Sequence, residues 1–146
     1  MPSWIRYHID ALEADAELYR FDEKALRSRF QAQVEEATAH TPPATDLHGT
    51  ELDDWYRTLF RSLEAEFRAD FNGWTAWKVG LKVGRRRMVL VVATEPDRPR
   101  LNVVLAAPAK VWERALRRAG PAAREAESRG IDVRIAEIRR SLDRSS

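Results

Sequence analysis

With 146 residues, no cysteine, 44% hydrophobic and 33% charged residues and a formal net charge of +2, the chain has the size and composition of a single soluble domain. The lack of cysteine excludes disulfide and thiol chemistry, and the longest uninterrupted apolar run, residues 88–93, is too short to cross a bilayer. The N-terminal sequence lacks the basic and continuous apolar segments of a secretion signal, so we expect a cytoplasmic protein without membrane association, in which residues 1–146 form one domain.

Residues 1–39 are predicted to form a helical hairpin. Ser3 can cap a first helix, because the apolar residues that follow it recur at helical spacing as far as Arg20. Asp22 can cap a second helix, which carries its own apolar stripe. Residues 40–49 contain two consecutive prolines and are therefore expected to form a loop.

Residues 50–138 are predicted to form the core, in the order α-β-β-β-α-α-β. Thr50 can cap a long amphipathic helix, which Asn72 and Gly73 are expected to end. The hydrophobic period then changes from about 3.6 residues to about 2, which indicates strands. The remaining elements expected, in chain order, are strands 77–83, 88–94 and 101–107, helices 108–119 and 121–129, a strand 131–135 and a tail 139–146.

These elements predict an α+β fold with the order α-α-α-β-β-β-α-α-β. Strand 77–83 alternates between apolar residues and lysine or glycine, whereas strand 88–94 is apolar on both faces. A strand with two apolar faces must be covered on both sides. We therefore expect the helical hairpin, the long helix and the C-terminal helices to cover both faces of a mainly antiparallel sheet of about four strands.

Charge is distributed unevenly along the chain. Residues 1–72 carry 8 basic and 15 acidic side chains, a net charge of −7, whereas residues 73–146 carry 17 and 8, a net charge of +9. This asymmetry indicates an anionic partner for the basic half, or halves that neutralise each other within the fold or across an interface. The 21 arginines and 21 alanines are typical of a GC-rich, bacterial coding sequence. The number of arginines is therefore poor evidence for nucleic-acid binding, and their positions are more informative.

The hairpin WKVGLKVGRRRMVLVV, residues 77–92, is the strongest candidate for a binding site. If its second glycine and first arginine form a two-residue turn, Lys82 lies directly opposite Arg87, and Lys78 lies on the same face. Like charges in opposed positions repel each other unless a negative group is near. Gly80, between the two lysines, allows a ligand to approach the backbone closely. The hairpin is therefore either a surface for phosphates or a solvated tip whose cations need no ligand.

Two classes of binding function fit this charge layout, and we expect no catalytic site. In the first, the basic C-terminal half contacts nucleic-acid phosphates without reading sequence. In the alternative, the protein is an interaction module such as an inhibitor, immunity protein or assembly subunit, which uses its acidic or basic half. Trp74, expected to be exposed, is a possible interface anchor for that role. The candidate residues for an anionic partner are Lys78, Lys82, Arg85, Arg86, Arg87, Arg114, Arg117 and Arg118.

An enzyme with a metal site in residues 40–54 is a weaker alternative. His40, Asp46 and His48 are its candidate ligands, but the two histidines are eight residues apart across a double proline, which matches no zinc or iron pattern. Acidic residues at the start of the following helix are explained by the helix dipole. We therefore expect neither a bound metal nor another cofactor.

The order helix, three strands, helix and strand in residues 50–138 is similar to the core of the PD-(D/E)XK nuclease superfamily. This resemblance implies catalytic magnesium held by a helix glutamate, an acid on the second strand and an E-x-K motif on the third. Glu64 or Glu66 could supply the helix acid, but strands 88–94 and 101–107 lack the other carboxylates. The sequence thus predicts at most a degenerate relative that binds without cleaving.

Overall fold

The structure is a computed structural model that describes residues 4–71 and 73–145, and over these residues it contains five helices and one five-stranded sheet. The α+β class predicted from the sequence is confirmed. The elements in chain order are β1 (Ile5–Tyr7), α1 (Ile9–Tyr19), α2 (Glu23–Ala37), α3 (Gly49–Ser62), β2 (Glu66–Phe71), β3 (Trp74–Val83), β4 (Arg86–Thr94), β5 (Leu101–Pro108), α4 (Ala109–Ala119) and α5 (Pro121–Ser145).

The sheet has the strand order β1-β5-β4-β3-β2, in which only the β1–β5 pair is parallel. The β3–β4 hairpin has the register predicted from the sequence, with Val83 opposite Arg86 and Lys82 opposite Arg87. Gly84 begins the turn with a φ of +62°, a left-handed conformation that favours glycine. The sequence rule for two-residue hairpin loops therefore placed every side chain of the hairpin on its correct face.

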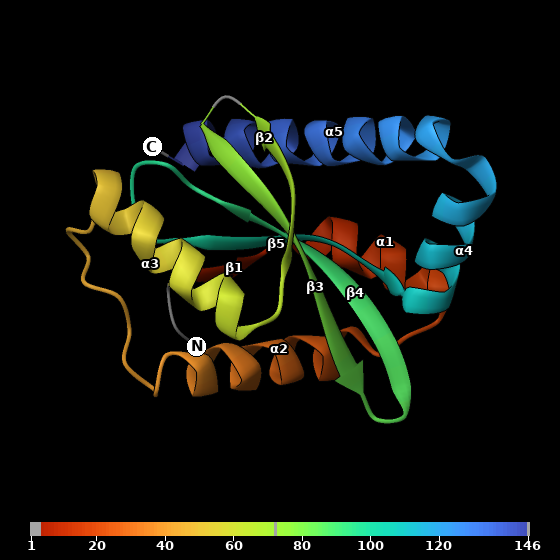
Figure 1. Ribbon diagram of the computed structural model, residues 1–146, viewed down its shortest axis with the longest axis horizontal. Coiled ribbons are helices and arrows are strands. Elements are labelled where there is room, and N and C mark those ends of the chain that lie inside the picture. The colour runs from red at the N-terminus through yellow and green to blue at the C-terminus, as the bar shows by residue number, and fades with distance from the viewer. Residues whose placement is uncertain (1–3, 72, 146) are drawn as a thin grey trace.

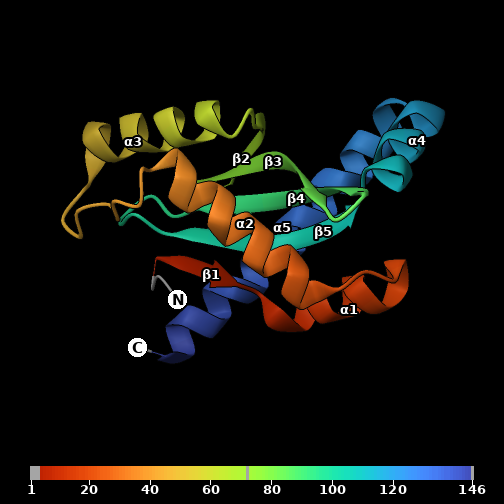
Figure 2. The same cartoon turned by 90° about the horizontal axis from the view of Figure 1, so that it is seen from below.

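Helices cover both faces of the sheet, as the two apolar faces of β4 predict. On the first face, α2 and α3 pack against the sheet, and the Phe60 ring stacks on Trp77 with 4.7 Å between ring centroids. On the second face, α4 and α5 pack through Trp112 and a row of isoleucines. Figure 1 shows the sheet between α2 and α5, and Figure 2 shows the same layers from below.

An ion pair between α1 and α5 covers the part of β5 that β1 does not reach. The carboxylate of Asp15 accepts a hydrogen bond from the backbone N–H of Ala106 (3.0 Å) and binds both terminal nitrogens of Arg134 (2.7 Å each). Arg134 also donates to the carbonyl of Val104 (2.8 Å). The hydrogen bond with Asp15 raises the pKa of Arg134 above its ordinary value. The pair thus satisfies polar groups at an otherwise open sheet edge.

The predicted start of the first helix is wrong, because residues 5–7 form the edge strand β1. A strand of three residues is too short to show a period of two, and its partner, β5, lies far along the chain. His8 caps α1 by accepting the N–H of Ala11 at Nδ1 (3.3 Å), whereas Ser3, the expected cap, lies outside the described residues. The predicted cap of α2 is confirmed, since Asp22 accepts the N–H of Ala25.

The helix predicted from Thr50 to Asn72 is also wrong at its ends. Its N-cap is His48, without a side-chain capping bond, and the helix ends at Ser62. Glu64 then takes a φ of +54°, and the chain turns into β2, which pairs with β3. Two phenylalanines of β2 are four residues apart and therefore fit a helix as well as a strand. Asn72, the expected stop, is not among the described residues.

The strand predicted at residues 131–135 and the tail at 139–146 are instead parts of α5, as far as Ser145. Ile131, Ile135 and Ile138 are buried at helical spacing, whereas Val133 is 56% exposed, which is a helical and not a strand pattern. The sheet therefore has five strands and not the four predicted: residues 131–135 are helical, and β1 and β2 are additional strands. At the start of α4, Pro108 is the N-cap rather than the first helical residue. Within the described chain, no helix is long and apolar enough to span a membrane.

Candidate anion-binding site

A groove of about 960 Å³ lies between the tip of the β3–β4 hairpin and helix α4. Its lining includes seven lysine or arginine residues and one acid, Glu113. Helix α4 contributes cations to one wall, and the hairpin contributes the others. This arrangement concentrates positive charge in a concave surface, where field lines are focused. The cations of this cationic groove are Lys82, Arg85, Arg86, Arg87, Lys110, Arg114 and Arg118.

The helical wall of the cationic groove is a row of three cations. Lys110, Arg114 and Arg118 are four residues apart, so their Cα atoms share one face of α4 and follow one another at about 6 Å along the helix axis. Trp112 is buried against the sheet and fixes which face of α4 is turned to the groove. Sequence reasoning missed Lys110, although its spacing from Arg114 and Arg118 is a visible signal.

The cations of the groove are largely free of acidic partners. Within the described part of the chain, Lys82, Arg87 and Arg114 form no ion pair, and the same holds for Arg85, Lys110 and Arg118. The one acid of the groove, Glu113, is paired with Arg117 at 3.8 Å. The positive charge of the groove is therefore available to an external anion.

Two of the predicted site residues have other roles. Arg86 lines the groove, but its guanidinium donates to the carbonyls of Arg20 (2.6 Å) and Tyr19 (3.1 Å) at the C-terminus of α1. A cation at this position satisfies helix carbonyls and stabilises the helix dipole. Arg117 does not line the groove and contacts Glu113 instead. Arg86 thus links the hairpin to α1, whereas its neighbour Arg87 is available to bind an external anion.

A second pocket of about 460 Å³ continues the cationic groove along β3. It shares Lys82 and Arg87 with the groove and also contains Lys78, whose Nζ lies 5.8 Å from the ring centroid of Trp112. Gly80 lies on its floor, and a Cβ added there would meet no atom within 4 Å. We call this space the Gly80 pocket. The structure therefore brings Lys78 beside the other predicted residues of the hairpin.

The acidic and basic halves of the chain form few ion pairs with each other among the described residues. Among the ion pairs of the described residues, only Asp15–Arg134 joins an acid of residues 1–72 to a base of residues 73–146. Most other pairs are local, and several lie within one helix. Direct ion pairs thus offset little of the charge asymmetry of the sequence, although Glu66 and Lys78, one from each half, are cross-strand partners.

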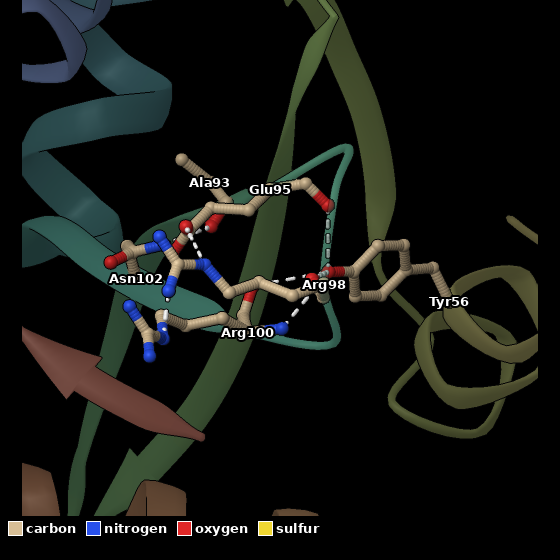
Figure 3. Close-up of polar contacts among 6 residues, drawn as sticks. All are labelled: Tyr56, Ala93, Glu95, Arg98, Arg100 and Asn102. Atoms are coloured by element: carbon tan, nitrogen blue, oxygen red, sulfur yellow. Dashed lines mark hydrogen bonds and ion pairs between the residues drawn. The ribbon is translucent and has the colours of Figure 1, made fainter. Parts of the chain in front are cut away.

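The arginines in the turn between β4 and β5 form a contrasting cluster (Figure 3). The buried carboxylate of Glu95 accepts from Arg98 Nε (3.1 Å) and from Asn102 Nδ2 (3.0 Å), and it lies 3.7 Å from Arg100 Nε. These cations therefore have an internal counter-charge, unlike those of the groove. The turn lies at the opposite end of β4 from the hairpin tip, so it belongs to a separate surface.

The hydroxyl of Tyr56 holds the same turn in place. It lies 2.9 Å from the carbonyl of Glu95 and 2.8 Å from that of Arg98, and it accepts the backbone N–H of Arg100 (3.0 Å). Burial raises the pKa of Tyr56 well above its ordinary value, so the phenol stays protonated. Because the polar groups of this cluster have partners within the protein, we interpret it as structural.

The other predicted residues are not gathered into a site. Trp74 is only 4% exposed, with the Arg139 guanidinium 5.9 Å from its ring centroid, so it is not the exposed anchor that the sequence suggested. It lies on the same face as Lys78, as expected, but this end of the face belongs to the second hydrophobic core. His40 lies 3.9 Å from Glu35, and His48 contacts the Asp46 carbonyl. Over the described residues, no group of three His, Cys, Asp or Glu is placed to hold a metal.

Comparisons of the chain with protein-family models, with curated proteins and with solved structures found no match. The nuclease-like order expected for residues 50–138 is absent too, because four strands follow α3 and two helices follow β5. Glu64 and Glu66 lie beyond the end of α3, not on a helix.

Proposed function

We propose that the protein binds nucleic-acid phosphates through the cationic groove, without reading base sequence and without catalysing a reaction there. One observation carries the proposal: six cations from the hairpin and α4 converge on one groove without acidic partners among the described residues. Binding that neutralises phosphates releases counterions and supplies most of the affinity in non-specific complexes. Phosphate contacts position a ligand but do not specify its sequence.

The shape of the groove favours nucleic acid over an acidic protein. A nucleic-acid strand presents charge at regular intervals, and the row from Lys110 to Arg118 presents cations at regular intervals along α4. Protein interfaces are usually anchored by aromatic side chains, whereas the groove is lined by none, and Trp74 is buried. Val111, 45% exposed, is the one large apolar side chain of its lining. The proposal keeps the cytoplasmic location expected from the sequence.

The test is fluorescence anisotropy of labelled single- and double-stranded DNA and RNA at low and near-physiological salt. The groove variant combines Lys82→Ala, Arg87→Ala and Arg114→Ala. The matched control removes the same charge from exposed positions of α5 outside the groove, by changing Arg124, Arg129 and Arg140 to alanine.

We expect the wild type and the control to bind with an affinity that falls as salt rises, and the groove variant to lose most of that affinity. The absence of binding at low salt would overturn the nucleic-acid function. An equal loss in both variants would show that net charge, and not the groove, attracts the ligand.

A further inference from the structure

The lining of the Gly80 pocket carries charges of both signs: three cations, Lys78, Lys82 and Arg87, and three carboxylates, Glu64, Glu66 and Glu113. Lys82 and Arg87 lie at the end that opens into the cationic groove. Glu64 and Glu66 lie at the other end, beside the start of β2, where Glu66 is the cross-strand partner of Lys78. A phosphate is attracted most strongly to the first end, where the two cations form no ion pair within the described residues, whereas the second end offers carboxylates as hydrogen-bond acceptors. The pocket therefore suits a ligand that is anionic on one side and donates hydrogen bonds on the other.

The floor of the pocket is open because residue 80 has no side chain. Gly80 is exposed and lies mid-strand, between two positions whose lysines share its face of the sheet. An added Cβ would meet nothing within 4 Å, and its backbone has no positive φ, so the fold itself does not require glycine. A glycine that the strand does not need often marks close approach of a ligand.

The carboxylates of the pocket are available as acceptors. Within the described residues Glu64 forms no ion pair, and Glu66 contacts Arg68 at 3.3 Å with 63% of its side chain exposed. Arg68, whose side chain is only 17% exposed, also binds Glu127 at the shorter distance of 2.7 Å, so Glu66 can exchange Arg68 for another donor while Arg68 keeps a partner. The pocket volume of about 460 Å³ is within the range of small-ligand sites.

We propose that the Gly80 pocket binds one nucleotide, with its phosphate on Lys82 and Arg87, its sugar and base over Gly80, and an exocyclic amino group of the base donating to Glu64 or Glu66. Adenine, cytosine and guanine carry such an amino group, whereas thymine and uracil do not. Because a phosphate binds best at the end with Lys82 and Arg87 and less well beside Glu64 and Glu66, the nucleotide is a strand end or an unpaired residue. If the nucleotide belongs to a nucleic-acid strand, the inference rests on the proposed function. A free nucleoside phosphate carries the same phosphate and amino groups for the same contacts.

The experiment compares short single strands of oligo-dA, oligo-dC and oligo-dT, together with free ATP and UTP, on four proteins. These are the wild type, Gly80→Val, the double variant Glu64→Ala and Glu66→Ala, and the control Gly130→Ala. Gly130 lies in α5, where an added Cβ also meets nothing within 4 Å. Thermal unfolding of each variant is measured in parallel.

We expect the wild type and the Gly130→Ala control to bind oligo-dA and oligo-dC about tenfold more tightly than oligo-dT, the effect of one hydrogen bond to a charged group. Gly80→Val should remove this preference without lowering the unfolding temperature. The double variant should also remove it, while binding oligo-dT at least as well as the wild type. Simple relief of charge repulsion would instead strengthen the binding of all three oligonucleotides equally and leave the ratio of their affinities unchanged.

The outcomes separate the pocket from the groove. Equal affinity for oligo-dA and oligo-dT, unchanged by Gly80→Val, would overturn the nucleotide pocket and leave the groove function standing. Binding of ATP but not UTP, without binding of any oligonucleotide, would support the pocket with a free nucleotide and overturn the nucleic-acid function. No binding of any ligand at low salt would overturn both. If Gly80→Val lowers the unfolding temperature, the double variant Glu64→Ala and Glu66→Ala, whose substitutions are at exposed positions, decides whether the pocket binds the base.

Discussion

Lys82 and Arg87 are cross-strand partners beside the turn of the β3–β4 hairpin, so two cations occupy directly opposed positions. No carboxylate among the described residues pairs with either of them. Opposed like charges destabilise a sheet, and the arrangement is understandable if an anion is bound there. The hairpin therefore retains a repulsion that a ligand would relieve.

Replacing Lys82 by threonine is expected to separate stability from binding. The change removes the repulsion and introduces a β-branched residue, so the free energy of unfolding should rise by about 0.3–0.5 kcal/mol. Affinity for DNA should fall, because one cation of the groove is lost. Urea denaturation and fluorescence anisotropy measure the two effects. A variant that is less stable than the wild type would show that Lys82 has a structural partner.

Adjacent arginines are expected to have different roles. Arg86→Ala removes two hydrogen bonds to the C-terminal carbonyls of α1 and should lower the free energy of unfolding by about 1 kcal/mol. Arg87→Ala should change stability by less than about 0.5 kcal/mol but weaken DNA binding. Urea denaturation and anisotropy of both variants test this assignment. The reverse pattern would place the binding role on Arg86.

The pair Asp15–Arg134 is expected to be among the most sensitive sites of the fold. Asp15→Ala leaves Arg134 and the N–H of Ala106 without their partner and should cost about 3–5 kcal/mol. Glu125→Ala, which breaks the exposed pair with Arg129, is the control and should stay within about 0.5 kcal/mol. The free energies of unfolding in urea provide the comparison. Equal costs for the two variants would contradict the role of Asp15 as a link between α1 and α5.

Tyr7 is expected to make the fold sensitive to alkaline pH. Burial raises the pKa of Tyr7 from 10.0 to about 12, so the unfolded chain loses this proton before the folded chain does. Stability from this group is complete below pH 10 and declines above it. The decline should be shallower in Tyr7→Phe. Urea unfolding on either side of pH 10 measures it, and parallel curves for the two proteins would contradict the assignment.

The hairpin was the most predictable part of the fold because its information is local. The glycine of the turn and the alternation along β3 predict the pairing of Lys82 with Arg87 that the sheet register shows. The edges of the sheet were less predictable. β1 is three residues long and pairs with distant β5, and β2 carries phenylalanines at a spacing that also fits a helix. The strand predicted at residues 131–135 is wrong for the same reason, because the spacing of Ile131, Val133 and Ile135 fits a strand, and only the exposure of Val133 shows that the segment is helical.

The sequence predicts most residues of the candidate site, but not how the fold brings them together. Charge and register identified the hairpin cations, whereas their convergence with Arg114 and Arg118 depends on the packing of α4 through Trp112. Arg86 binds carbonyls of α1, a tertiary contact that no spacing rule reveals, whereas Arg117 and Glu113 are four residues apart on one helix, a spacing that favours an ion pair. The burial of Trp74 depends in the same way on the packing of the second core, a tertiary feature.

The most direct test of the cationic groove is the slope of log binding constant against log salt concentration for duplex DNA. Each phosphate contact contributes about −0.9 to this slope, so removing Lys110, Arg114 or Arg118 singly should reduce its magnitude by about one. Arg129→Ala, which changes the net charge equally outside the groove, should leave the slope unchanged. A slope near zero for the wild type, or an equal reduction for Arg129→Ala, would contradict the account.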